Sequence, residues 1–418
     1  MAAFAGLDVG TTSSKAVVYG DDGAVLGTGR VATVWDDGPD GTQIDPQALC
    51  RSACAALSEA AEAAGVPVRA VGVTSMGESG VLTDGREEPV APVIAWHDTR
   101  DGAEVADLAA RIGVDAFGGI AGKPLRGQFS LTKHRWLLSH VPTARDAVTR
   151  FDVGGWVVRR LGGDVVLELS LAGRTGWLDV AAVDWWDDAL AWSGARAALM
   201  PPLVAAGVPV GAVTSDAVSP LLRGAVLTLA GHDHQASALG ARATGPGSEL
   251  DSSGTAEALV RTIAAVPARA DIARLAAAGI TTDPSVEAGR WSLLGGTEGG
   301  LAQQRVLQRL GLEMAELDRA AQRSPDDDPG RTWRSVVAAA ADEALVLHRA
   351  MDDVVGPAVR IVVTGGWRHS AEVMRAKHIR FSDLEVSGVE EAGALGAATL
   401  AARACGALGR DDHLGARP

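Results

Sequence analysis

The spacing of apolar and polar positions in the first 35 residues predicts three short strands joined by tight turns. Leu7 and Val9 precede a polar turn, and an apolar run at 16–19 follows it. The acidic turn at 21–23 leads into a third stretch, from 25 to 33, so we expect a meander of hairpins. A helix that Asp45 caps and Pro46 begins is expected after it, running through 48–64, followed by strands at 70–75, 81–83 and 93–95.

The middle of the chain is more broken. Helices are expected between 100 and 150, interrupted by glycines, and again over 151–161 and 184–200. The last of these carries Trp185, Trp186 and Trp192, which we interpret as core packing because large aromatic side chains are usually buried. Residues 224–230 (GAVLTLA) predict a fresh strand, which we interpret as the start of a second unit near Leu222. The predicted domains are therefore 1–222 and 223–418.

Strands and helices continue to alternate in the last part of the chain, apart from 266–300, which gives no clear pattern. A helix over 235–243 and strands at 249–254 and 258–263 are expected first. The elements expected after them are an acidic turn at 326–330, a helix over 335–355, a strand at 360–364, a helix over 371–378, a strand at 384–386 and a closing helix over 392–407.

Length and composition limit the class of protein. With 418 residues the chain is expected to form two domains or three. Its net charge of -14 argues against a nucleic-acid surface, which needs a basic patch, but leaves a nucleotide open. The sequence contains no apolar run of about 20 residues, no signal-peptide pattern and no disulfide framework. We expect a soluble, cytoplasmic protein without a membrane segment.

The first polar turn, in GLDVGTTSSK at 6–15, carries candidate chemistry. Gly10 frees the backbone to turn, and the hydroxyl and N–H groups after it can cradle phosphate oxygens. Asp8, at the end of a buried strand, suits Mg²⁺, which binds through a few carboxylates and phosphate oxygens. An ordinary hairpin with a polar turn would also fit. The predicted phosphate-binding residues are Gly10, Thr11, Thr12, Ser13 and Lys15.

A second candidate lies in GHDHQA at 231–236. Asp233 follows a predicted buried strand, where a carboxylate can accept the proton of a substrate hydroxyl and help to hold Mg²⁺. A helix N-cap is the plainer interpretation. His232 and His234 should point away from Asp233 on an extended chain, so we expect no three-ligand metal site and place His232 on the substrate side.

Two later glycine turns are further candidates for nucleotide binding. DSSGTA at 251–256 offers Gly254 and Thr255 for phosphates, in a type of turn that is common in proteins. TGGW at 364–367 ends a predicted strand, where Gly365 and Gly366 allow the backbone to approach a ligand closely beside Trp367.

Taken together, these motifs resemble the FGGY carbohydrate kinases of the sugar kinase, Hsp70 and actin superfamily. The resemblance implies an α/β fold in which two ribonuclease-H-like (actin-like ATPase) domains flank a cleft. It implies ATP and Mg²⁺ as cofactors and phosphorylation of a hydroxyl of a small sugar or polyol, with Asp233 as the general base. In such kinases Gly254 and Thr255 would hold the terminal phosphates, and 364–367 would line the adenosine pocket.

The resemblance also suggests where the substrate binds. Family members bind sugar hydroxyls with residues from two places, which here carry Gly77, Glu78, Trp96, Asp98 and Arg100. Glycerol kinases have Arg-Glu where this chain has Gly77-Glu78, and xylulokinases have Met-His-Gly, so neither substrate is indicated. Trp96 and Arg100 would equally suit a structural role. A homodimer is a further possibility.

Two other functions remain open at this level. One is an ATPase of the same superfamily that acts on water or on a protein partner. The other is a nucleotide or sugar sensor without turnover, against which the presence of Asp8, Lys15 and Asp233 speaks. Typical FGGY kinases are also longer, and the shortfall lies between Thr255 and the helix expected from 335.

Overall fold

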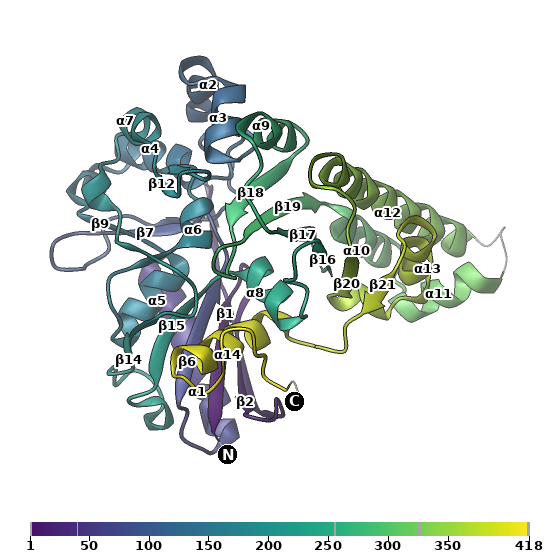
Figure 1. Ribbon diagram of the computed structural model, residues 1–418, viewed down its shortest axis with the longest axis horizontal. Helices are drawn as coiled ribbons and strands as arrows, with labels where there is room; N and C mark the ends of the chain where they lie inside the picture. Colours follow the sequence, from purple (N-terminus) through teal and green to yellow (C-terminus); the bar gives the residue numbers. More distant parts are fainter. Residues whose placement is uncertain (1, 40, 255, 324–327, 416–418) are drawn as a thin grey trace.

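Two six-stranded mixed sheets with helices around them form the protein in this computed structural model (Figure 1). The structure describes residues 2–39, 41–254, 256–323 and 328–415. Within these residues, no helix combines the length and the apolar character that a membrane crossing requires.

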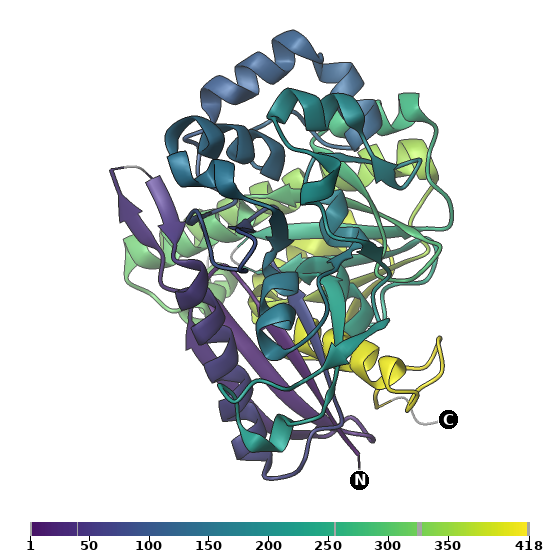
Figure 2. The same ribbon diagram turned by 90° about the vertical axis from the view of Figure 1, so that its left-hand side faces the viewer.

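The first sheet has the order β14-β15-β6-β1-β2-β3. The strands β1, β2 and β3 form the predicted antiparallel meander. Later in the chain, β6 pairs parallel with β1, and β15 pairs parallel with β6. The bounds are β1 (Ala3–Val9), β2 (Ser13–Gly20), β3 (Val25–Ala32), β6 (Ala70–Ser75), β14 (Pro209–Ala212) and β15 (Val226–His232). The helix α1 (Pro46–Ala64) packs along its outer face (Figure 2), and the Asp45 carboxylate caps that helix as expected.

The second sheet repeats this topology. In the order β18-β19-β17-β16-β20-β21, the strand β16 pairs antiparallel with β17 and parallel with β20, as β1 does with β2 and β6. The bounds are β16 (Ser248–Ser253), β17 (Glu257–Ile263), β18 (Ile280–Pro284), β19 (Trp291–Thr297), β20 (Arg360–Thr364) and β21 (Leu384–Val386). The shared topology confirms the expected pair of related α/β units.

Residues 224–230 do not open the second sheet, so that expectation is wrong. They lie in β15, which pairs parallel with β6 and completes the first sheet. The sequence of an apolar strand does not show which strand it pairs with. Here the partner is β6, which lies far earlier in the chain. The boundary near Leu222 that rested on this strand stays a prediction.

Several helices also differ from expectation. The helix at 151–161 begins two residues later, because 149–152 form a strand. Only 187–193 of the stretch 184–200 is α-helical, although its tryptophans do pack against an apolar cluster. Residues 328–330 belong to the long helix α12 rather than to a turn, and 326–327 lie outside the described residues. Residues 266–300 form a helix and two strands.

The remaining elements fall into three groups. Short strands connect the first unit: β4 (Asp36–Gly38), β5 (Gly41–Ile44), β7 (Gly80–Thr83), β8 (Val93–Ile94), β9 (Thr149–Asp152), β10 (Leu167–Glu168), β11 (Leu178–Asp179), β12 (Asp184–Trp185) and β13 (Leu203–Val204). Its helices are α2 (Gly102–Arg111), α3 (Val114–Ala121), α4 (Ser130–His140), α5 (Val153–Leu161), α6 (Leu169–Gly173) and α7 (Asp187–Ser193), with 3-10 turns η1 (Pro142–Asp146), η2 (Ala197–Leu199) and η3 (Pro220–Leu222). The second unit carries α9 (Arg269–Ala277), α10 (Gly299–Leu310), α11 (Met314–Arg323), α12 (Asp328–Val355), α13 (Ala371–Arg380) and η4 (Gly366–His369).

Two helices of small residues, α8 (Asp233–Gly240) and α14 (Ala392–Ala404), lie between the sheets (Figure 1). The helix α14 packs on β1 and β6, while α8 shares an apolar cluster with β16, β17 and β20. The two helices approach at backbone distance, because a Cβ at Gly396 would lie 1.9 Å from the Ala236 carbonyl oxygen. This contact joins the units just below the ends of β1 and β15.

We predict that Gly396→Ala lowers the free energy of unfolding by about 2 kcal/mol or more, because backbone atoms leave no room for the methyl group. Helix propensity alone would favour alanine by roughly 1 kcal/mol. Denaturant titration measures the effect, with Gly102→Ala in α2 as the control, since its methyl group meets nothing within 4 Å. A Gly396→Ala variant as stable as the control would show that α14 does not pack this closely.

Candidate functional site

Asp8 and Asp233 lie at the same edge of the first sheet. Asp8 is near the end of β1, and Asp233 directly follows β15, which runs parallel to β6 and thus to β1. The Oδ1 atom of Asp8 is buried and has no hydrogen-bond partner among the described residues. Asp233 Oδ1 accepts the N–H of His234 at 2.7 Å.

Both carboxyl groups titrate far from their usual range. Burial raises the pKa of Asp8 to about 7, and the charge of Asp233 raises it further than Lys15 lowers it. Burial also raises the pKa of Asp233 to about 7, with Glu78 acting in the same direction and Arg174 against it. The two predicted metal-binding acids therefore share one electrostatic environment.

The donor set at this edge fits Mg²⁺. The described residues hold no group of three or more His, Cys, Asp and Glu side chains that would cage a metal ion. Mg²⁺ commonly binds through one or two carboxylates with phosphate oxygens and water. The unpartnered oxygen of Asp8 and the raised pKa values of both acids suit a cation brought in with a phosphate-bearing ligand.

Tryptophan side chains from neighbouring segments hold the turn after β1, while other hydroxyl groups of the turn have no partner among the described residues. Trp35 Nε1 donates to the Thr11 carbonyl at 2.7 Å, and Trp96 Nε1 donates to the Thr11 hydroxyl at 2.9 Å. Ser13 Oγ is buried without a partner in the described part of the chain, while Thr12 is exposed. The predicted substrate residue Trp96 thus contacts the predicted phosphate loop.

Lys15 is engaged by a distant acid. Its Nζ lies 3.1 Å from Glu391 Oε2, at the start of α14, and both side chains are about one-third exposed. Exposed pairs of this kind are worth roughly 1 kcal/mol or less, so a phosphate could displace Glu391 at small cost.

The two later glycine turns lie against each other. Gly365 has a φ of +86°, and a Cβ there would lie 2.3 Å from the Ser253 carbonyl oxygen and 3.0 Å from the Gly254 nitrogen. A Cβ at Gly366 would meet nothing within 4 Å, so this turn faces open space. Trp367 packs against Trp333, with the two rings tilted by 46° and their centroids 5.9 Å apart. Thr255 lies outside the described residues.

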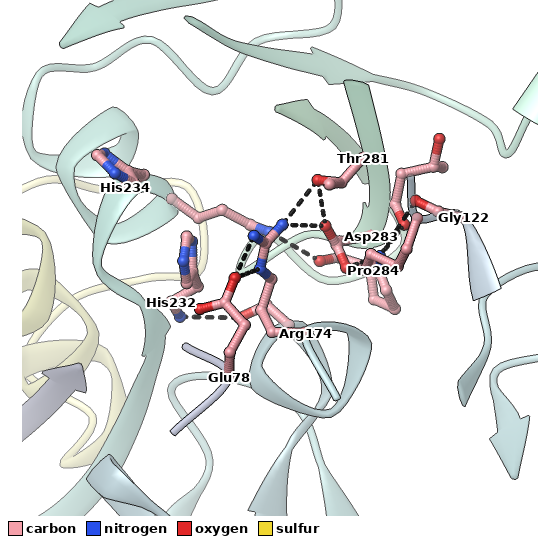
Figure 3. Close-up of polar contacts among 12 residues, drawn as sticks. Glu78, Gly122, Arg174, His232, His234, Thr281, Asp283 and Pro284 are labelled. Atoms are coloured by element: carbon pink, nitrogen blue, oxygen red, sulfur yellow. Dashed lines mark hydrogen bonds and ion pairs between the residues drawn. The ribbon is translucent and has the colours of Figure 1, made fainter. Parts of the chain in front are cut away.

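Glu78 belongs to a buried ion network that is centred on Arg174 and joins the two units (Figure 3). Its Oε1 accepts from Arg174 Nε at 3.0 Å, from Arg174 Nη2 and from Gln128 Nε2 at 2.8 Å. Arg174 Nη1 reaches β18 of the second sheet, donating to Thr281 Oγ1 at 2.7 Å and lying 3.2 Å from Asp283 Oδ2. No described residue bonds Glu78 Oε2, so that oxygen is available to a substrate hydroxyl.

Lys123 completes this network on the other side. Its Nζ lies 2.6 Å from Asp283 Oδ1 and donates to the Thr282 carbonyl at 2.8 Å. The side chains of Lys123, Arg174, Glu78 and Asp283 are all at most 4% exposed. Glu78 also has a φ of +64°, which is strained for a residue with a side chain, and such strain concentrates at functional positions.

Gly77 and His232 border Glu78. A Cβ at Gly77 would lie 2.9 Å from both Arg174 Cγ and His232 Cδ2, so only glycine fits between them. His232 Nε2 lies 3.3 Å from Asp233 Oδ1, which contradicts the expectation that this side chain points away from Asp233. The reason is that the chain bends into α8 at Asp233, so extended geometry does not apply. Burial and the charge of Arg174 hold the pKa of His232 well below its usual range.

Asp98 and Arg100 bind each other and the segment at 41–44. Arg100 Nε donates to Asp98 Oδ1 at 2.9 Å and Arg100 Nη1 donates to Gln43 Oε1 at 2.9 Å, while Thr42 N–H donates to Asp98 Oδ2 at 2.5 Å. Burial would raise the pKa of Asp98, but these bonds outweigh it and lower the pKa. The described contacts therefore do not bring this pair to Glu78, and its role in substrate binding stays a prediction.

Sequence reasoning missed four charged residues: Lys123, Arg174, Asp283 and Lys377. Lys377 lies below the second glycine turn, between the carboxylates of Asp251 and Glu257. No motif surrounds any of them, and Arg174 is 109 residues from Asp283. Only the rule that a buried charge needs a partner could have found them, and burial cannot be seen in the sequence.

We predict that Asp8→Asn raises the free energy of unfolding, relative to the wild type, more at pH 8 than at pH 5. Both acids have folded pKa values near 7, above the ordinary 3.8, so the folded state holds protons that the unfolded state releases. Stability must then fall as the pH rises from about 4 to 7, and Asn removes part of that loss, on the order of 2 kcal/mol. Thermal unfolding at both pH values measures it, with the exposed Asp21→Asn as control. Equal pH dependence in wild type and Asp8→Asn would contradict the burial of this carboxyl group.

Comparison with known proteins gives a family match and full-length structural likeness. Residues 3–240 match the N-terminal domain of the FGGY family of carbohydrate kinases. The glycerol kinase of Leifsonia xyli subsp. xyli is 30% identical over 270 residues, which cover 61% of this chain and 53% of that enzyme. The chain therefore spans about half the length of the curated relatives it matches.

Solved structures cover nearly the whole chain. The xylulose kinase from Rhodospirillum rubrum superposes with a TM-score of 0.85 at 25% identity, over 98% of this chain and 92% of that one. The Plasmodium falciparum glycerol kinase with ADP gives 0.87 at 17% identity, over 98% and 90%. The second likeness shows the fold alone, and together they confirm the expected fold class.

Proposed function

Since the chain belongs to the FGGY family of carbohydrate kinases, we propose that it transfers the terminal phosphoryl group of ATP to a hydroxyl of a small sugar or polyol. The observation that carries this proposal is the meeting of Asp8 and Asp233 at one edge of the first sheet, beside a turn rich in hydroxyl and N–H donors. Phosphoryl transfer needs positioning, charge stabilisation and a proton acceptor more than covalent help from the protein.

Asp233 is the proton acceptor in this proposal. With a pKa raised by burial to about 7, it is partly ionised at neutral pH and more basic than an exposed aspartate. His232 stays neutral beside it, because burial lowers the pKa of that imidazole. The attacking hydroxyl gives its proton to Asp233 as its oxygen bonds to the phosphorus.

Glu78 and Trp96 orient the acceptor. The unbonded Oε2 of Glu78 accepts a hydrogen bond from a second hydroxyl of the substrate, while Arg174 holds the other oxygen in place. Trp96 offers an apolar wall and links this wall to Thr11 of the phosphate loop. A polyhydroxylated substrate would thus be held by its hydroxyl groups, which suits sugars and polyols alike.

The nucleotide phosphates would lie between the turn at 10–15 and the paired turns at Gly254 and Gly365. Gly10, Thr11, Thr12, Ser13 and Lys15 contribute donors from the first unit, and Gly365, Gly366 and Trp367 border the adenosine side. Mg²⁺, held by Asp8 with Asp233 nearby, would neutralise charge on the phosphate oxygens. The Glu391 carboxylate leaves Lys15 when phosphate binds.

We predict that ADP release depends on an added acceptor and drops at least about a thousandfold in Asp233→Asn. A panel of tetroses, pentoses, hexoses and polyols with a coupled ADP assay measures both, and circular dichroism checks that the variant folds. The exposed Asp188→Asn serves as the matched control. ADP release without any acceptor would favour an ATPase that uses water, and nucleotide binding without product would favour a sensor.

The pH profile gives a separate prediction. Activity should fall as the pH drops through about 7, because Asp233 must be unprotonated to accept a proton. Arg174 lowers the pKa of Asp233 and Glu78 raises it, so Arg174→Gln should move this limb to higher pH, and Arg174→Lys should move it less. Measurements of kcat/KM between pH 5.5 and 9, at about half-unit steps, test the shift. A lower maximal kcat/KM with the acidic limb at an unchanged pH would show that Arg174 has a structural role alone.

A further inference from the structure

A cavity lies in the first unit, among helices that carry none of the motifs discussed above. It has a volume of about 580 Å³ and is bordered by α4, η1, the end of α7 and η2. Small-molecule sites usually have volumes of roughly 300–1,000 Å³. Its lining residues include none of the groups assigned to phosphate, metal or acceptor binding.

The lining of this cavity contains three arginines and no carboxylate, and one of the three, Arg135, forms an ion pair with Asp107 at 2.9 Å. Arg135, Arg145 and Arg196 border it, together with Ser139 and Ser193, in a chain that carries 52 acidic against 38 basic residues. In the described part of the chain the exposed guanidinium of Arg196 has no hydrogen bond or ion pair, and the exposed Arg145 side chain uses only its Nε, on the Leu138 carbonyl. Their remaining guanidinium donors match the fork of a phosphate or a carboxylate.

Two further groups point to a ligand rather than to solvent alone. His134 lines the cavity and is only 5% exposed, yet its Nδ1 has no partner in the described part of the chain. Trp192 offers an apolar ring face there, fixed by Arg135, whose guanidinium stacks 4.5 Å above it. A buried polar atom without a partner normally costs stability, so it is expected to serve a bound group.

We propose that this cavity binds a small phosphorylated metabolite of the sugar-phosphate class. Its phosphate pairs with Arg145 and Arg196, its hydroxyl groups meet Ser139 and His134, and its carbon skeleton lies against Trp192. A bare phosphate ion would leave most of the volume empty. The site does not depend on the proposed kinase activity.

The helix α4 connects the cavity to Glu78. It carries His134 and Arg135 into the cavity, and one turn earlier it carries Ser130, whose hydroxyl donates to the Glu78 carbonyl. Arg150 Nη2 donates to that Ser130 hydroxyl at 2.7 Å. A small cavity of about 20 Å³, bordered by Glu78, Ser130, His134 and Arg150, lies between the two sites. A ligand that moves α4 should therefore change how Glu78 holds the acceptor, a consequence that rests on the proposed function.

Calorimetric titration tests the site itself. The probes are ribose 5-phosphate, ribose and inorganic phosphate, each added to the full-length protein. Ribose 5-phosphate should bind more tightly than either fragment, and Arg145→Gln/Arg196→Gln should weaken its binding about tenfold or more. Arg86→Gln/Arg319→Gln makes the same charge change at exposed positions elsewhere and should bind as the wild type does. Equal binding to both double variants, or no binding of ribose 5-phosphate below about 10 mM, would overturn the proposal.

Kinetics test the coupling separately. Saturating ribose 5-phosphate should change the KM for an accepted sugar or polyol at least twofold in the wild type and leave it unchanged in Arg145→Gln/Arg196→Gln. Binding without this change would overturn the coupling through α4 but not the site. A protein that binds the probe and phosphorylates no acceptor would overturn the proposed function and leave the binding site standing.

Discussion

The guanidinium group of Arg174 is the constraint on which the geometry of the site depends. It is almost fully buried and bonds Glu78 of the first unit with one edge and Asp283 of the second sheet with the other. Removing one partner of such a network leaves an uncompensated buried charge, which costs about 3–5 kcal/mol. The orientation of Glu78 and the placement of the second unit are therefore fixed together, so the proposed acceptor site depends on both units.

The two carboxyl groups at the end of the first sheet are not compensated in this way by ion pairs within the described residues. The charge of Asp233 raises the proton affinity of Asp8, and both side chains are partly buried with few partners, which costs stability. The close packing of α14 on β1, β6 and α8 offsets this cost directly beneath them. The packing of the small-residue helices thus stabilises the fold, while the strand ends keep charged groups with which a cation and phosphates can interact.

Much of the fold could be predicted because its signals are local. The meander at 3–32, the capped helix after Asp45 and the strand at 360–364 each depend on alternation or capping within a few residues. The partner of β15, the ion pair of Arg174 with Asp283 and the contact of His232 with Asp233 depend on segments brought together by folding. The acids and glycine turns of the site were predictable as residue types at strand ends. The buried cations that hold them were not, because nothing in a sequence marks a lysine or arginine as buried.

The repeated topology places the two predicted phosphate turns at equivalent positions, so their chemistry can be compared. Leu7-Asp8 precedes Gly10-Thr11 at the end of β1, and Leu250-Asp251 precedes Gly254 at the end of β16, the equivalent central strand of the second sheet. Asp251 and the nearby Glu257 share an ion pair with the buried Lys377, whereas Asp8 forms no ion pair among the described residues, although each aspartate keeps one oxygen without a hydrogen-bond partner there. A lysine in α13 thus offsets charge in one copy of the motif. Under the proposed function, backbone donors would meet phosphate there, and the proposed metal-binding acid would lie in the unit that also carries Asp233.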